Sequence, residues 1–166
     1  FGRSWTNDET KTAITSIQLP DTVTSVGKNA FAYNYLQSIN IPNSVTIIGE
    51  QAFAGNNFST IEISENVSVI ESGAFKDCKK LQKIKIPDTA KNIGTMLFGN
   101  CIKLTGAELP QGIDRITEWL FAGCTSLEQF SVPDTVQLIE DYAFSKCNNL
   151  TNIKLPDQIQ TIGNYA

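Results

Sequence analysis

Four cysteines lie at a constant interval of 23 residues, which raises the question of a shared chemical role. Thiolates ligate zinc, pair as disulfides and act as nucleophiles. A tetrahedral zinc site needs every sulfur about 2.3 Å from one ion, whereas side chains on successive coils of a repeating backbone are about 4.8 Å apart and too widely spread. A buried row of reduced thiols, one or two disulfides and a redox role remain as interpretations of Cys78, Cys101, Cys124 and Cys147.

The chain contains no histidine. Ser-His-Asp and Cys-His sites, His-ligated zinc and the usual proton shuttle near neutral pH all require imidazole. Acidic and amide side chains recur after a proline, where they could bind calcium but fit a turn cap equally well. We expect no catalytic residue, no metal site and no cofactor. The row after the proline consists of Asp21, Asn43, Glu65, Asp88, Gln111, Asp134 and Asp157.

Large side chains occupy the position two residues before a recurring phenylalanine in the C-terminal half of the chain. One is a thioether and three are aromatic, with carboxylates beside them. Such a row can anchor a protein partner or hold a sugar ring, and it can equally cover the outer edge of the core. A glycosidase pair of carboxylates is disfavoured, because a regular repeat offers no deep cleft to raise the pKa of an acid. The candidate partner-binding residues are Met96, Trp119, Tyr142, Tyr165, Glu118 and Asp141.

All these positions belong to a repeat of 22 or 23 residues. Asn34 and Asn56 stand in the cysteine position of the shorter copies. The six prolines of the chain share one position of the repeat: Pro20, Pro42, Pro87, Pro110, Pro133 and Pro156. Phenylalanine recurs at another: Phe31, Phe53, Phe75, Phe98, Phe121 and Phe144.

Each unit reads L-x-x-I-x-I-P-D-x-V-x-x-I-G-x-x-A-F-x-x-C-x-x-L. The I-x-I alternation predicts a strand, which proline ends because it cannot donate to a sheet ladder. A second apolar pair predicts a short second strand, and glycine then leads into a helical or 3-10 turn that carries the phenylalanine. One unit cannot bury enough apolar surface to fold alone, so we expect about seven coils stacked on one continuous core.

The outward side of the first strand is polar. Charges of opposite sign alternate there between neighbouring coils, which suits a solvated sheet face with modest cross-strand pairs or a broad docking face. The row consists of Gln18, Asn40, Glu62, Lys85, Glu108, Ser131 and Lys154.

The composition of the 166 residues is that of a soluble globular protein, with 41% hydrophobic and 18% charged residues. No apolar run approaches the roughly 18 residues of a membrane span. A net charge of -4 without a dense basic cluster argues against nucleic acid and anionic membranes as partners. We expect residues 14–166 to form the solenoid domain of a larger protein, after an irregular segment or insertion at residues 1–13.

The repeat resembles the BspA-like, or Treponema-type, class of leucine-rich repeats. The resemblance covers about residues 14–166 and implies a solenoid of parallel strands. It further implies a secreted or surface-attached protein without catalysis, which adheres to a host matrix protein, receptor or other protein ligand. An architectural spacer and a carbohydrate-binding surface remain as alternatives. The departures from the family pattern, which could alter local coil shape, are Ser64 for Pro, Glu71, Thr117 and Glu140 for Gly, and Leu97 and Leu120 for Ala.

Overall fold

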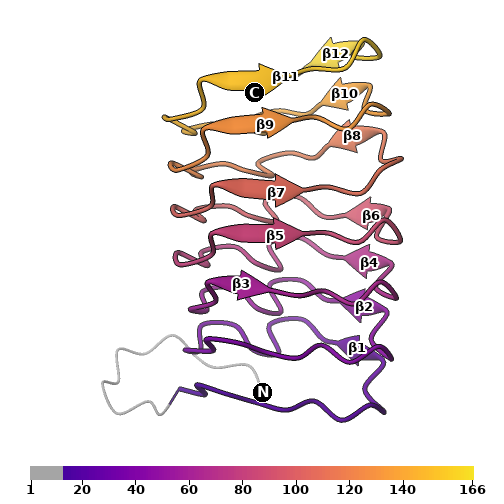
Figure 1. Ribbon diagram of the computed structural model, residues 1–166, viewed down its shortest axis with the longest axis vertical. Coiled ribbons are helices and arrows are strands. Elements are labelled where there is room, and N and C mark those ends of the chain that lie inside the picture. The colour runs from indigo at the N-terminus through magenta and orange to yellow at the C-terminus, as the bar shows by residue number, and fades with distance from the viewer. Residues whose placement is uncertain (1–12) are drawn as a thin grey trace.

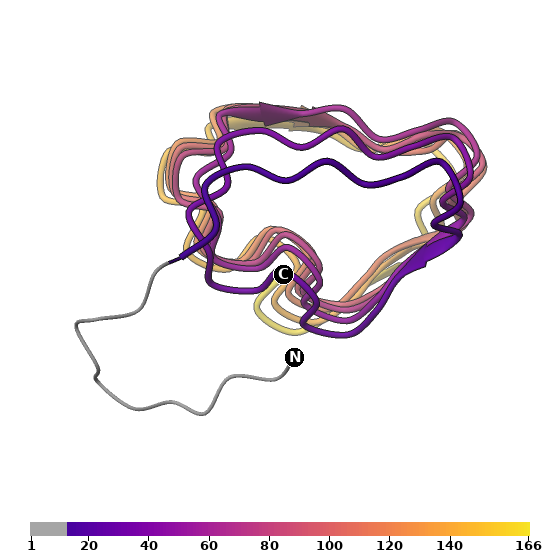
Figure 2. The same ribbon diagram turned by 90° about the horizontal axis from the view of Figure 1, so that it is seen from below.

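A computed structural model describes residues 13–166 of the protein. The backbone winds into a solenoid whose coils stack along one axis (Figure 1). Viewed along that axis, successive coils follow nearly the same path (Figure 2). The irregular segment expected at residues 1–13 lies outside the described residues except for Ala13.

The I-x-I motif of each unit forms the first strand of a coil. The first strands are β3 (Thr60–Ile61), β5 (Lys83–Lys85), β7 (Gly106–Glu108), β9 (Gln129–Ser131) and β11 (Asn152–Lys154). These strands form two parallel sheets, β3-β5-β7 and β9-β11, with like residues opposite each other, as Ile61 and Ile84 are. The two apolar side chains of the motif point into the core and the residue between them points out, as with Ile84, Ile86 and the exposed Lys85, which strand alternation requires. An isolated bridge between Gln18 and Asn40 precedes the row.

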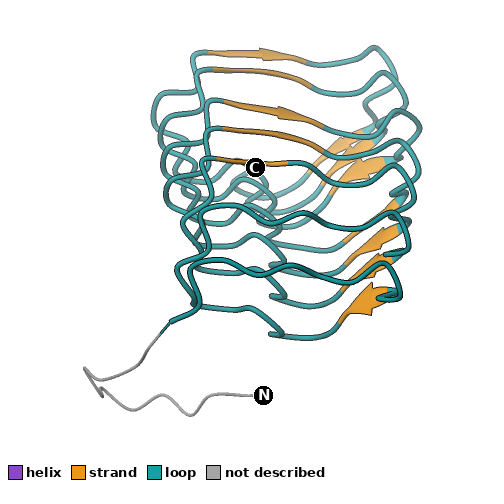
Figure 3. Cartoon of the chain, turned by 60° about the horizontal axis from the view of Figure 1, so that its bottom comes forward, coloured by secondary structure: helices purple, strands orange, loops and turns teal. Residues whose placement is uncertain are grey.

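A second row of parallel strands lies on another side of the coils (Figure 3). The chain reaches it through a turn at the proline, whose carbonyl accepts a hydrogen bond from the residue three positions later, as in Val45 N to Pro42 O at 3.0 Å. Seven second strands bound six complete turns, fewer than the seven coils predicted. They are β1 (Ser25–Val26), β2 (Ile47–Ile48), β4 (Val69–Ile70), β6 (Asn92–Ile93), β8 (Arg115–Ile116), β10 (Leu138–Ile139) and β12 (Thr161–Ile162).

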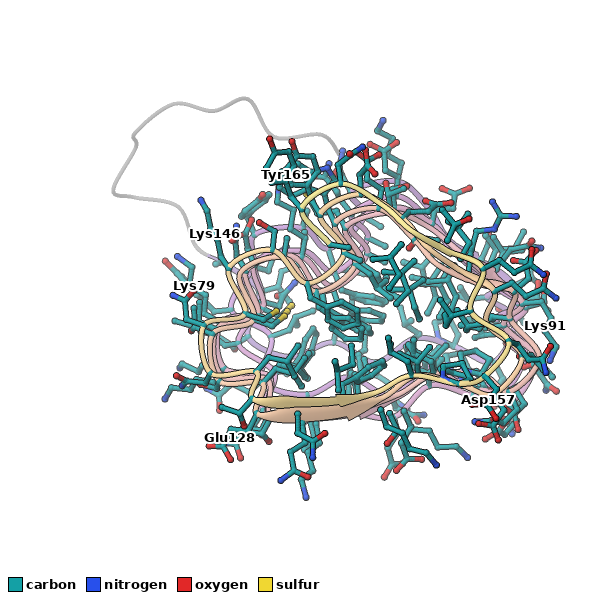
Figure 4. The ribbon with its side chains drawn as sticks, turned by 90° about the horizontal axis from the view of Figure 1, so that it is seen from above. Lys79, Lys91, Glu128, Lys146, Asp157 and Tyr165 are labelled. Atoms are coloured by element: carbon teal, nitrogen blue, oxygen red, sulfur yellow. The ribbon has the colours of Figure 1, made fainter. Side chains whose placement is uncertain are left out.

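A column of phenylalanine rings forms the centre of the core. Consecutive rings from Phe31 to Phe144 stack with centroids between 5.4 and 6.4 Å apart. Phe53, Phe75 and Phe98 have no exposed surface. Figure 4 shows that the interior of the coil is filled with side chains. Each buried ring contributes about 1.5 to 3 kcal/mol by its removal from water, and the contribution repeats in every coil.

The segment that carries each phenylalanine is a series of turns, so the prediction of a helical or 3-10 turn is wrong. No helix occurs among residues 13–166. Ala52 N donates to Gly49 O, and Ala54 N donates to Gln51 O, each at 3.1 Å. Gln51 has a φ of 52° and Gly55 a φ of 69°, and two such residues recur in every complete coil. Positive φ interrupts the run of negative values that a helix requires.

Candidate functional site

The large side chains before each phenylalanine lie on a backbone position that does not favour them. Met96, Trp119, Tyr142 and Tyr165 have φ values of 53°, 59°, 57° and 54°. This left-handed region suits glycine or asparagine and costs other residues about 1 to 2 kcal/mol. Gly73 and, in the first coil, Asn29 occupy the same repeat position. Bulky residues kept at such a position point to a role other than backbone fit.

Hydrogen bonds between coils fix this backbone position. Met96 N donates to Glu118 O at 2.9 Å, Trp119 N to Asp141 O at 3.2 Å, and Tyr142 N to Asn164 O at 2.9 Å. Two residues further on, the backbone of each phenylalanine is fixed in the same way, as in Phe121 N to Ala143 O at 2.8 Å. The side chains therefore repeat at the coil spacing, with the phenylalanine inside and its large neighbour outside.

The three aromatic rings stack face to face. The centroids of Trp119 and Tyr142 are 4.1 Å apart with ring planes at 8°, and those of Tyr142 and Tyr165 are 5.1 Å apart at 15°. Trp119 and Tyr142 are half-buried, whereas Tyr165 is 77% exposed and lies at the rim of the coil in Figure 4. Met96 holds the same position one coil earlier. We call Met96, Trp119, Tyr142 and Tyr165 the aromatic ladder.

Of the two carboxylates predicted beside the aromatic ladder, Glu118 contacts it directly and Asp141 contacts the residue before Tyr165. Glu118 Oε1 accepts a hydrogen bond from Trp119 Nε1 at 2.9 Å, which holds the indole edge. Asp141 Oδ1 accepts from the backbone N of Asn164 at 2.7 Å and so joins two coils. The structure therefore brings all six candidate residues to one side of the solenoid, in the turns that follow β6, β8, β10 and β12.

An open hollow of about 520 Å³ adjoins the aromatic ladder. Glu118, Glu140 and Asp141 line it, and no lysine or arginine does. Asn164 also lines it and was not identified in the sequence, although it precedes Tyr165 as Asp141 precedes Tyr142. Because Glu140 Oε1 also accepts from Arg115 at 3.3 Å, part of the negative charge is compensated at the edge. The hollow favours a cationic or hydrogen-bond-donating group.

The cysteines form a row of free thiols without a disulfide, of which Cys78, Cys101 and Cys124 are buried and Cys147 is half-buried. Cys101 Sγ donates to Phe75 O at 3.2 Å, and Cys124 Sγ donates to Phe98 O at 3.2 Å. Burial raises the pKa of the Cys78 thiol to about 12 and that of Cys147 to about 11. The sulfur atoms gather inside the coil in Figure 4. Such thiols are poor nucleophiles, because the thiolate is the reactive form.

The other polar rows do not converge on a reactive centre in residues 13–166. Asp88 Oδ1 accepts from Gln111 N at 2.7 Å, so this member of the row after the proline caps a turn. Lys85 pairs with Glu65 at 3.3 Å on the exposed face. Within the same residues, no three Cys, Asp or Glu side chains are grouped as metal ligands. None of these residues lies in a helix long and apolar enough to cross a membrane.

Comparison with known proteins identifies close structural relatives. Six copies of the BspA-type leucine-rich repeat region match residues 9–128 and 47–166. A leucine-rich repeat protein from Bacteroides ovatus is 33% identical over 92% of the chain, with a TM-score of 0.89. The T. pallidum leucine-rich repeat protein is 27% identical over 90% of the chain, with a TM-score of 0.81, and the chain covers 73% of it.

The pneumococcal vaccine antigen PcpA is 28% identical over 87% of the chain, with a TM-score of 0.68. The chain spans only 40% of the length of the Bacteroides ovatus protein and 38% of PcpA. No curated protein matches the chain.

Proposed function

The chain belongs to the family of BspA-type leucine-rich repeat proteins, and on that premise we propose that it is a non-enzymatic protein-binding module of a secreted or cell-surface protein. The aromatic ladder is its contact surface. The single observation that carries this proposal is the retention of Met96, Trp119, Tyr142 and Tyr165 at positive φ. The pneumococcal vaccine antigen PcpA, one of the relatives, supports a surface location.

The chemistry of the surface defines the kind of partner. The edges of stacked aromatic rings offer rigid apolar area at low entropic cost, as binding hot spots do. The adjoining hollow is lined by Glu118, Glu140 and Asp141, which favours lysine or arginine on the partner. A host matrix or receptor protein that presents an apolar side chain next to a basic one fits both features.

A carbohydrate is a weaker candidate for the same residues. Sugar rings stack on the faces of aromatic rings, but the faces of Trp119 and Tyr142 cover each other at 4.1 Å. Among the described residues, only the two end faces of the stack, one on Trp119 and one on Tyr165, have no aromatic ring on them. An architectural spacer would require no ladder, because Gly73 or Asn29 fits the same backbone position.

The double substitution Trp119→Asn and Tyr142→Asn tests the proposal. Asparagine tolerates the left-handed backbone, so the coils should remain folded while the contact surface is lost. We expect binding to an array of immobilised extracellular matrix proteins to fall at least about tenfold, the equivalent of about 1.4 kcal/mol. Circular dichroism checks that the fold is retained.

Tyr35→Asn is the matched control, since Tyr35 is 57% exposed and lies far from the aromatic ladder in the repeat order. It should leave binding unchanged. Equal binding by the double variant and the wild type would contradict the proposal. The absence of any matrix-protein binding would favour a spacer, and binding restricted to a glycan array would favour carbohydrate.

A further inference from the structure

The second row of strands is interrupted between β6 and β8. These strands belong to different sheets, β1-β2-β4-β6 and β12-β10-β8. No Cα atom of Asn92–Ile93 lies within 8 Å of a Cα atom of Arg115–Ile116. Parallel neighbours are normally about 4.8 Å apart. Figure 1 shows the wider separation between β6 and β8.

The two coils remain joined on the opposite side. Phe98 N donates to Leu120 O at 3.0 Å, and the rings of Phe98 and Phe121 are 5.4 Å apart. The coils therefore diverge from the phenylalanine column toward the second strands. Between β8 and β10 the second strands are hydrogen-bonded again, with Glu140 N donating to Ile116 O at 2.9 Å. The corresponding bond from Thr117 N to Ile93 O is missing.

Thr117 accounts for the divergence. Gly94, at the same repeat position, lies so close to the preceding coil that an added Cβ would be 2.2 Å from Ser72 N. Glu71 retains its ladder bond to Ile48 O at 2.9 Å, so a Cβ alone does not open the step. Thr117 is β-branched and stiffer, and its hydroxyl donates to Gly94 O at 3.1 Å in place of the backbone. Lys91 Nζ braces the other end by donating to Gln111 O.

A cavity of about 900 Å³ occupies the space that this divergence leaves. Its inner wall includes Ile93, which is half-buried although Ile70 and Ile116 at the same repeat position are fully buried. Its lining also carries two cations, Lys91 and Arg115, and three carboxylates, Glu50, Glu71 and Asp114. A strand in this space with an aliphatic side chain toward the core and a polar side chain toward solvent would continue the pattern of the neighbouring second strands.

We propose that the space between β6 and β8 binds one extended peptide segment of a partner protein, which completes the interrupted sheet through main-chain hydrogen bonds. Inserting one strand requires two spacings, about 9.6 Å, which agrees with the separation of more than 8 Å. Both facing strands offer main-chain donors and acceptors that the ladder leaves unpaired, and an extended peptide presents matching groups on both of its edges. This site is separate from the aromatic ladder.

The lining selects the side chains of the peptide. Alternate residues would point inward, where an aliphatic side chain would cover Ile93. Residues that point outward would lie near Lys91, whose ammonium has no carboxylate within ion-pair distance among the described residues. Arg115 is already paired with Asp114 at 2.9 Å. Because three carboxylates and two cations line the space, we expect the ligand to be a peptide with aliphatic side chains at its inward positions and polar side chains at its outward positions.

A synthetic peptide with the sequence of residues 65–72, Glu-Asn-Val-Ser-Val-Ile-Glu-Ser, is a suitable probe because its natural copy contains β4, which pairs with β6. We expect saturable binding in fluorescence polarisation with the labelled peptide. Hydrogen exchange at the amides of Arg115 and Thr117 should slow when the peptide binds. A control peptide N-methylated at alternate amides keeps every side chain but cannot donate, and should bind at least about tenfold more weakly.

Thr117→Gly restores the glycine of the repeat and should let β6 and β8 pair directly. Peptide binding should then fall at least about tenfold. Thr125→Gly is the matched control, because Thr125 also donates to the preceding coil, to Ile102 O at 3.2 Å, outside the cavity. The Trp119→Asn and Tyr142→Asn variant should bind the peptide normally.

Several results would overturn the proposal. They are equal binding of the N-methylated peptide, unchanged binding by Thr117→Gly, no saturable binding up to about 1 mM, or a dimer in sedimentation that the peptide dissociates. The last result would assign the space to a second copy of the chain. If the Trp119→Asn and Tyr142→Asn variant lost binding to matrix proteins, that result would concern the proposed function and would leave these tests of the peptide site unchanged.

Discussion

At the scale of single residues, the cysteine position serves hydrogen bonding between coils. Cys101 Sγ donates to the carbonyl of Phe75 in the preceding coil. In a shorter copy, Asn56 Nδ2 donates to Phe31 O at 2.8 Å, and its Oδ1 accepts from Leu36 N at 3.0 Å. The asparagine amide and the cysteine thiol thus donate to equivalent phenylalanine carbonyls, which explains why either residue type can occupy this position of the repeat.

The pH dependence of stability tests this role of the thiols. Burial raises the pKa of Cys78 to about 12 and raises that of Cys124. The unfolded thiol ionises near pH 8.5, so above that pH the unfolded state binds fewer protons and stability falls until the folded thiol ionises. We expect Cys124→Ala to reduce this fall by about 1.4 kcal/mol per pH unit between about pH 9 and 11, measured by urea unfolding.

Thiol labelling provides the independent check. Cys147, which is half-buried, should react first with a thiol reagent at pH 8, and Cys78, Cys101 and Cys124 should react only as the protein unfolds. Rapid labelling of all four in the folded protein, or an unchanged pH slope in Cys124→Ala, would show that the thiols are accessible.

At the scale of the element, the glycine before each turn has different roles in different coils. An added Cβ at Gly94 would lie 2.2 Å from the backbone of Ser72, whereas one at Gly27 would have none of residues 13–166 within 4 Å. Gly94 therefore permits the close approach of two described coils. This difference depends on the neighbouring coil and is invisible in the repeat itself.

Alanine substitution at the two glycines separates these roles. Gly94→Ala should lower the free energy of unfolding by about 1 to 3 kcal/mol, because backbone must move to admit the methyl group. Gly27→Ala should be neutral or stabilise by up to about 1 kcal/mol through the unfolded chain. Chemical denaturation of both variants measures the difference. Equal effects would mean that the coils are not packed as closely at Gly94 as described.

The repeat pattern predicted which side chains share a column but not every backbone detail. The phenylalanine column, the parallel strands and the position of the aromatic ladder follow from side-chain type and spacing. The turns that replace the predicted helical segment depend on positive φ at residues such as Trp119 and Tyr142, which their identity does not favour. The opening between β6 and β8 depends on how Thr117 meets another coil, although the departure from glycine marked the place.

At the scale of the whole molecule, the stacking of coils produces two columns of side chains from two repeat positions that lie two residues apart. The phenylalanine column faces the core, with Phe98 fully buried, and it provides the stability that single coils lack. The aromatic ladder lies two residues earlier and faces outward, where its rings remain accessible to a partner. Under the proposed function, stability and recognition depend on separate residues of the same turn.

The most direct test compares the free energies of unfolding of Phe98→Ala and of the Trp119→Asn and Tyr142→Asn double variant by urea denaturation. Phe98→Ala should cost about 3 to 5 kcal/mol. The double variant loses ring stacking of about 0.5 to 1.5 kcal/mol but gains relief of left-handed strain, so we expect a smaller loss than that of Phe98→Ala. A loss in the double variant equal to or larger than that of Phe98→Ala would contradict the account, because the ladder would then hold the fold together.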